Sequence, residues 1–191
     1  MDRTEIRFRK RFAIGHTVIF QRCLPVSDIV IGDFDHGKAN ALEGRDDIIR
    51  VPCEKDDTDT VYAVKEAVKR GFEDFLLIGV IGQRLDHSLG NLSILLWLDS
   101  LGKKCCLVDD YSEMEIVSRE PVSISDRYAY FSLLNITGRA RGITIRDAKY
   151  PLDGGEITCE YQYGISNEVL PGKTAQVWAD DGKLLLIKVF G

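Results

Sequence analysis

The chain has 191 residues, of which 45% are hydrophobic and 29% are charged, a balance typical of a folded globular protein. Its formal net charge of −5 argues against extended nucleic-acid binding, because proteins that hold many phosphates present a basic face. No apolar run approaches the roughly 20 residues that span a bilayer, and no apolar stretch typical of a secretory signal follows the cationic residues 1–11. We therefore expect a cytoplasmic protein without membrane or nucleic-acid partners.

The cysteines are odd in number and form no C-x-x-C pair, which argues against a disulfide framework and against a zinc site. Two of them are adjacent in an apolar run, where successive side chains of a strand point to opposite faces. We expect buried free thiols. The five cysteines are Cys23, Cys53, Cys105, Cys106 and Cys159.

Short β-prone runs alternate with helical stretches from residue 28 to about residue 108. The helical stretches carry valines or leucines on one face, and glycines at Gly71 and Gly102 are expected to end them. A repeated order of strand, helix and strand predicts a mostly parallel sheet with right-handed crossovers. The expected strands are residues 28–32, 48–51, 75–81 and 104–108.

After Asp110 the helical stretches disappear, and β-prone segments are separated by turn signals. We therefore expect an α/β catalytic domain over residues 1–110 and an all-β sandwich or jelly-roll-like domain over residues 111–191. A loop is expected at residues 153–155, and a hairpin at residues 181–182. The expected strands are residues 113–118, 128–134, 142–146, 157–163, 175–178 and 184–189.

The first polar cluster, Asp33 and Asp35, follows an expected strand. In an extended backbone these two carboxylates project to the same side, where they repel each other unless a cation lies between them. A divalent metal is one interpretation. Because a single D-x-D pattern is common, a solvated acidic turn is the other.

The second cluster, Asp56, Asp57 and Asp59, lies at the start of an expected helix. Acids in this position cap free backbone N–H groups without any ligand, and we expect Asp56 or Asp57 to do only that. Asp59 lies inside the first turn, from which it can instead face a metal.

The third cluster, Arg84 and Asp86, lies between an apolar strand and a helix. The guanidinium group of arginine suits phosphate oxygens, although a surface ion pair explains the same residues. His87 is either a base or simply solvated, and the second interpretation is favoured. With no G-x-x-x-x-G-K-[ST] motif in the chain, these clusters indicate a metal-dependent enzyme of phosphate chemistry.

Four segments in order resemble bacterial thiamine pyrophosphokinases. The resemblance implies an α/β catalytic domain followed by a β-sandwich domain, and a homodimer with active sites in clefts between subunits. It also implies transfer of the terminal diphosphate of ATP to thiamine with Mg²⁺, which gives thiamine diphosphate and AMP. The four segments are Gly32–Asp35, Lys55–Asp59, Gly82–Asn91 and Gly164–Glu168.

The resemblance also implies roles for individual residues, three of which would hold Mg²⁺: Asp33, Asp35 and Asp59. Arg84 and Asp86 would lie at the diphosphate and the reacting hydroxyl. Trp178 would lie flat against a thiamine ring, although a tryptophan in an alternating strand is more often part of the core. The residues implied to bind nucleotide or substrate are Lys55, Asp56, Gln83, His87 and Asn91, and Ser166 and Asn167 resemble the thiamine-recognition segment.

The chain departs from the family pattern in two places. Residues 1–27 lack the usual glycine-rich turn, and His36 stands where a serine normally follows the D-F-D segment. The missing turn favours one of two alternatives that accompany the main hypothesis, the non-catalytic relative. One is a pterin pyrophosphokinase, which would use similar acids with a different alcohol, and the other is a degenerate relative that binds thiamine without catalysis.

Overall fold

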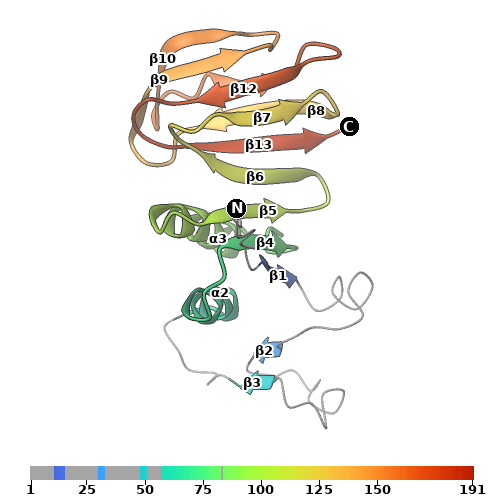
Figure 1. Cartoon of the computed structure of the whole chain (residues 1–191), viewed down its shortest axis with the longest axis vertical. Helices are drawn as coiled ribbons and strands as arrows, with labels where there is room; N and C mark the ends of the chain where they lie inside the picture. The colour runs from blue at the N-terminus through green and yellow to red at the C-terminus, as the bar shows by residue number, and fades with distance from the viewer. Residues whose placement is uncertain (1–10, 16–29, 33–47, 51–56, 83) are drawn as a thin grey trace, which may run out of the picture.

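The computed structural model describes residues 11–15, 30–32, 48–50, 57–82 and 84–191. The burial and contacts of side chains are described from residue 57 onward. Figure 1 shows a stack of strands that runs from β10 to β1, with β2 and β3 below it. The helices of these segments are α2 (Asp59–Lys69) and α3 (Leu85–Ser100). The strands are β1 (Arg11–Gly15), β2 (Val30–Gly32), β3 (Ile48–Arg50), β4 (Asp74–Ile78), β5 (Lys104–Val108), β6 (Ser112–Val117), β7 (Val122–Ser125), β8 (Tyr128–Leu134), β9 (Arg139–Arg146), β10 (Leu152–Thr158), β11 (Gly164–Asn167), β12 (Thr174–Trp178) and β13 (Leu184–Phe190).

Helix α2 begins at a threonine cap. The side chain of Thr58 accepts a hydrogen bond from the backbone N–H of Val61 at 3.3 Å, so the expectation that Asp56 or Asp57 caps this helix is wrong for Asp57, and Asp56 lies outside the described residues. Asp57 instead pairs with Lys65, with 2.6 Å between Oδ2 and Nζ. The helix ends as predicted at Gly71, whose φ of +79° is readily adopted only by glycine.

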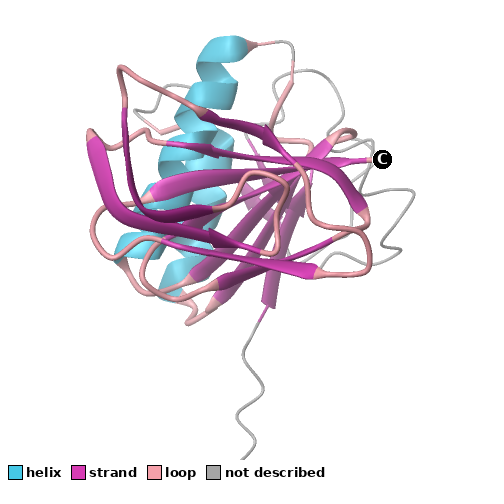
Figure 2. Cartoon of the chain, turned by 90° about the horizontal axis from the view of Figure 1, so that it is seen from above, coloured by secondary structure: helices cyan, strands magenta, loops and turns pink. Residues whose placement is uncertain are grey.

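Helix α3 is apolar on most of its surface. Its C-terminal half packs Ile94, Leu95 and Leu98 into the core between the helices and the sheet. Gly102, with φ +69°, follows the helix and donates its N–H to the carbonyl of Asp99 at 2.9 Å. Viewed from above, the helices lie along one side of the strands (Figure 2).

The main sheet has seven strands in the order β1-β4-β5-β6-β13-β8-β11. In this sheet only β1 with β4 and β4 with β5 pair in parallel, while every pair from β5 to β11 is antiparallel. A mostly parallel sheet is therefore not confirmed, since this sheet is mostly antiparallel. The physical reason is the short turn at residues 109–111, which is too short for the crossover that a parallel strand requires.

A second, four-stranded antiparallel sheet has the order β10-β9-β12-β7. Its inner residues pack against the β6, β13 and β8 part of the main sheet around Phe131, Ile143 and Leu186. Side chains of β13 alternate between the two cores, because Leu186 faces the second sheet and Leu185 faces the helices. The two layers form a β-sandwich, and the main sheet continues across residue 110, so the division into domains at that residue stays a prediction.

Two turn predictions are wrong. Asp181 and Gly182 do not form a hairpin, because β12 and β13 lie in different sheets. Asp181 instead exchanges backbone hydrogen bonds with Arg141 at 2.9 and 3.2 Å. Residues 153–155 lie inside β10, whose pairing with β9 is irregular on both sides of Gly155. No helix among the described residues is long and apolar enough to cross a membrane.

Candidate active site

The predicted metal-binding acids are only partly described by the structure. Asp59 begins α2, and its exposed side chain lies in the first turn, where the helix dipole favours a negative charge. Asp33 and Asp35, which directly follow β2, lie outside the described residues. Within the described part of the chain, no group of three or more His, Cys, Asp or Glu side chains is arranged to hold a metal ion. Lys55, Asp56 and Gln83 also lie outside the described residues.

Arg84 and Asp86 flank the beginning of α3 and bind each other through two hydrogen bonds. Arg84 Nε donates to Asp86 Oδ1 at 3.2 Å, and Nη2 donates to Oδ2 at 2.6 Å. The hydrogen bond from Arg84, helped by the backbone N–H of His87, lowers the pKa of Asp86 to about 2, and the same pair raises the pKa of Arg84. Because both side chains are exposed, little free energy holds them together, and a phosphate can displace the carboxylate from the guanidinium.

The loop between β4 and α3 is hydrogen-bonded to the sheet and to the helix. Gly79, with φ +69°, donates its N–H to Val108 of β5 at 3.1 Å. Asn91 is buried and donates from Nδ2 to the carbonyl of Val80 at 2.6 Å, so the structure shows it bound to the loop. His87 is exposed on the first turn of the helix. Among the predicted residues, Arg84, Asp86, His87 and Asn91 therefore lie in one loop and helix, and Arg84 and Asp86 are the two whose side chains bond to each other.

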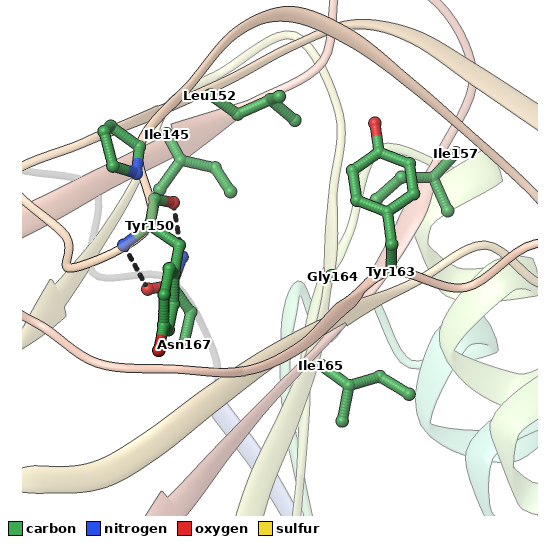
Figure 3. Close-up of a pocket in the computed structure, with 9 residues that line it drawn as sticks. Ile145, Tyr150, Leu152, Ile157, Tyr163, Gly164, Ile165 and Asn167 are labelled. Carbon is green, nitrogen blue, oxygen red and sulfur yellow. Dashed lines mark hydrogen bonds between the residues drawn. The ribbon is translucent and has the colours of Figure 1, made fainter.

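Ser166 and Asn167 end β11 at the far edge of the main sheet. Ser166 is exposed, has a positive φ of 57°, and donates its N–H to Ser132 Oγ at 3.0 Å. Asn167 is buried; its Oδ1 accepts the N–H of Tyr150 at 3.0 Å, and its Nδ2 donates to the carbonyl of Tyr150 at 2.8 Å (Figure 3). Sequence reasoning missed Tyr150, since contacts between distant segments leave no local signal.

A cavity of about 130 Å³ lies beside Asn167, between Tyr150 and Tyr163 (Figure 3). Its other walls are mostly apolar, with Leu152, Ile157 and Ile165 among them. A cavity of this size and lining suits a single aromatic ring. The cavity therefore has room for a small organic group beside Asn167.

Trp178 lies elsewhere in the sandwich. Its neighbours in sequence, Val177 and Ala179, are buried in the core, so its ring is on the outer face of the four-stranded sheet. The guanidinium carbon of Arg146 is 5.1 Å from the ring centroid. Trp178 does not line the cavity at Asn167.

The two groups of predicted residues are far apart in one chain. The loop that leads to Arg84 follows β4, whereas Ser166 lies on β11, and the order β4-β5-β6-β13-β8-β11 separates them by five strand spacings. At about 4.8 Å per spacing this is roughly 24 Å along the sheet. One copy of the chain does not bring Arg84 and Ser166 to one small ligand.

Comparisons with known proteins identify both halves of the chain. Residues 15–107 match the family model "Thiamin pyrophosphokinase, catalytic domain", and residues 114–184 match "Thiamin pyrophosphokinase, vitamin B1 binding domain". A curated relative, thiamine pyrophosphokinase of Bacillus subtilis (strain 168), is 27% identical over 138 residues, which are 71% of this chain. The chain spans 64% of the length of that relative.

Solved structures show the same fold. Thiamine pyrophosphokinase of Bacillus subtilis has a TM-score of 0.82 at 22% identity and covers 94% of this chain and 86% of its own. The enzyme of Geobacillus thermodenitrificans has a TM-score of 0.77 at 25% identity, with 92% and 83% covered. The enzyme of Candida albicans, at only 12% identity, has a TM-score of 0.75 and covers 96% and 89%.

Proposed function

Because this chain belongs to the thiamin pyrophosphokinase family, we propose that it transfers the terminal diphosphate of ATP to thiamine. The observation that carries the proposal is the presence of both family domains in one chain, catalytic and vitamin B1 binding. The paired Arg84 and Asp86 at the start of α3 lie in the catalytic half. Thiamine diphosphate and AMP are the proposed products.

Asp33, Asp35 and Asp59 are the proposed ligands of Mg²⁺. The donor set fits, because carboxylate oxygens are the ligands that this ion prefers, and Asp59 presents an exposed carboxylate at the start of α2. When bound, the ion supplies charge neutralisation along the phosphate chain of ATP. Lys55, Asp56 and Gln83 are proposed to lie near the same phosphates.

Arg84 and Asp86 are proposed to act on the reacting groups. Arg84 leaves Asp86 and binds phosphate oxygens through its planar guanidinium. The freed carboxylate of Asp86 then accepts a hydrogen bond from the thiamine hydroxyl and orients it. The hydroxyl oxygen forms a bond to the β-phosphorus as its proton passes to solvent water, the bond from that phosphorus to the bridging α–β oxygen breaks, and AMP leaves with that oxygen. Once Arg84 has left, the carboxylate of Asp86 returns toward an ordinary pKa of about 3.9 and is still a weak base near neutral pH, so its proposed role is orientation.

Two copies of the chain are proposed to share each active site. The separation between the α3 loop and Ser166 is too large for one thiamine to contact both within one chain. The start of α3 also exposes Leu85 by 69% and Leu89 by 56%, apolar surface beside the catalytic pair that a second copy would cover. The proposed assembly is a homodimer in which one copy supplies Arg84 and its partner supplies Ser166 and Asn167.

Product analysis tests the proposed activity. The protein is incubated with ATP, MgCl₂ and thiamine, and the nucleotide products are separated. Formation of AMP in step with thiamine diphosphate is expected. Formation of ADP would overturn diphosphate transfer, turnover of a pterin alcohol in place of thiamine would support the pterin enzyme, and thiamine binding without product would support the non-catalytic relative.

Complementation tests the shared site. Arg84→Met and Ser166→Phe variants are prepared separately and then mixed under conditions that let subunits exchange. Each variant alone is expected to be inactive, and the mixture is expected to recover up to roughly a quarter of wild-type activity, because half of the dimers then carry one intact site. No recovery despite measured exchange would contradict a site built from two copies.

A further inference from the structure

The buried face of α3 changes character along the helix. Its C-terminal half buries only apolar side chains, Ile94, Leu95 and Leu98. Its first two turns bury two polar side chains instead, Ser88 and Asn91, each 7% exposed. A buried polar side chain costs free energy unless it is hydrogen-bonded, so its partners indicate what it does.

Both side chains bond to the same short loop. The Oγ of Ser88 accepts the backbone N–H of Gly82 at 3.1 Å, and it lies 3.2 Å from the carbonyl of Gly82 and 3.1 Å from that of Arg84, to either of which it can donate. Asn91 Nδ2 donates to the carbonyl of Val80 at 2.6 Å. The loop between β4 and α3 is thus held by the helix at three of its residues.

We propose that Ser88 and Asn91 are positioning residues that fix the loop between β4 and α3 and thereby aim Arg84 at the phosphate chain. This inference rests on the proposed function for the identity of the ligand, and it gives Asn91 a role other than substrate contact. The physical basis is preorganisation. Arg84 is exposed and must leave Asp86 to bind phosphate, so the position of its guanidinium then depends on where the backbone of the loop is held.

The competing explanation is that Ser88 only stabilises the fold. A serine at the other end of α3 provides a control that distinguishes this explanation from a positioning role. Ser100 Oγ donates to the carbonyl of Trp97 at 2.6 Å, so it bonds backbone as Ser88 does, but it lies on the exposed last turn. Ser100→Ala is therefore the matched control for Ser88→Ala. Ser88→Thr keeps the hydroxyl and serves as the rescue variant.

The test combines kinetics with hydrogen exchange on the full chain. Ser88→Ala is expected to lower kcat for AMP formation by roughly 10- to 100-fold, as small misplacements of binding groups do. It is also expected to speed amide exchange at Gly82, whose N–H loses its acceptor. Ser88→Thr should restore both values, and Ser100→Ala should change neither. Asn91→Leu, which removes the donor but keeps the bulk, should speed exchange in the same loop.

Two results would overturn the inference. One is a Ser88→Ala protein whose kcat and loop exchange both stay within about twofold of wild type, a range in which surface changes usually fall. The other is a loss of kcat that Ser100→Ala reproduces, or that Ser88→Thr does not repair. Amide exchange at Gly82 does not depend on turnover, so it decides whether Ser88 holds the loop even if the wild-type protein makes no AMP.

Discussion

Arg84 and Asp86 bind each other side by side, with Nε to Oδ1 at 3.2 Å and Nη2 to Oδ2 at 2.6 Å. The hydrogen bond from Arg84 is the main reason that the pKa of Asp86 falls to about 2. Replacing Arg84 with Met should therefore raise the pKa of Asp86 toward its ordinary value of about 3.9. Carboxyl carbon NMR titration measures this change, and a pKa that stays near 2 would show that another group holds the carboxylate.

The Arg84–Asp86 pair also predicts how kcat/KM depends on pH. Because its pKa is depressed, Asp86 is ionised at every pH above about 4, and it gains a proton only as the pH falls through about 2. Any acid limb of kcat/KM between about pH 5 and 8 should therefore arise from another group. We expect the Asp86→Glu variant, if active, to keep the same acid limb. A limb that moves with this substitution would assign it to residue 86.

Asp59 and Asp57 provide a matched test of the proposed magnesium ligands. Asp59→Asn should lower magnesium-dependent turnover by about 100-fold or more, because a lost metal ligand weakens charge stabilisation in the transition state. Asp57→Asn removes only an exposed ion pair to Lys65 and should leave turnover nearly unchanged. Turnover is measured across a magnesium titration. Equal losses in the two variants would contradict the assignment.

A cluster of one buried lysine and two half-buried glutamates joins β13 to β6. Lys188 Nζ lies 2.9 Å from Glu113 Oε2 and 2.8 Å from Glu115 Oε1, and Tyr128 donates its hydroxyl to Glu113 at 2.7 Å. Burial alone would lower the pKa of Lys188, but Glu115 and Glu113 outweigh burial and raise it. Lys188→Met removes the cation from Glu115 and leaves Glu113 only the more distant Arg127, 3.6 Å away, so it should cost at most about 3–5 kcal/mol of unfolding free energy.

Urea unfolding measures this cost, and its pH dependence checks the cause. A raised lysine pKa means that the stabilisation is present below about pH 10.4 and disappears only as the pH rises through the still higher folded value. The cost of Lys188→Met should therefore be constant from about pH 6 to 9. Adding Glu113→Gln should cost less than the sum of the single changes. Simple additivity would argue against direct coupling.

The described cysteines differ in burial. Burial raises the pKa of Cys105 to about 12 and that of Cys106 to about 11, whereas Cys159 is exposed. All three are free, but the expectation of buried thiols is wrong for Cys159 and holds only in part for Cys105 and Cys106, which are half-buried, while Cys23 and Cys53 lie outside the described residues. At about pH 8, iodoacetamide should modify Cys159 and leave Cys105 and Cys106 largely intact in the folded protein, because the thiolate is the nucleophile. Peptide mass mapping reads the result, and rapid modification of Cys106 would contradict it.

Helix ends can be predicted from the local sequence, whereas strand pairing cannot. The ends of α2 and α3 were predictable, since Gly71 and Gly102 terminate helices through their own backbone conformation. Strand pairing is not local. Asp181 and Gly182 resemble a hairpin turn, yet the chain crosses from one sheet to the other there because Asp181 pairs with Arg141, forty residues earlier.

The candidate site shows the same difference between local and non-local features. The segment from Gly82 to Asn91 could be recognised in the sequence because its loop and helix lie close together along the chain. The sequence could not predict that Ser88 and Asn91 turn inward and hold the loop, because a serine and an asparagine in this position could equally contact a ligand. The bonds between Asn167 and Tyr150 join positions seventeen residues apart and required the structure.

The central claim is that a diphosphate passes intact from ATP to thiamine at the start of α3. Position-labelled ATP tests it most directly. With ³²P at the β position, the account predicts that label appears in thiamine diphosphate and not in AMP, and that Arg84→Met lowers the rate of its appearance by roughly 100-fold. Label from the γ position in thiamine monophosphate, with β label retained in ADP, would contradict the account.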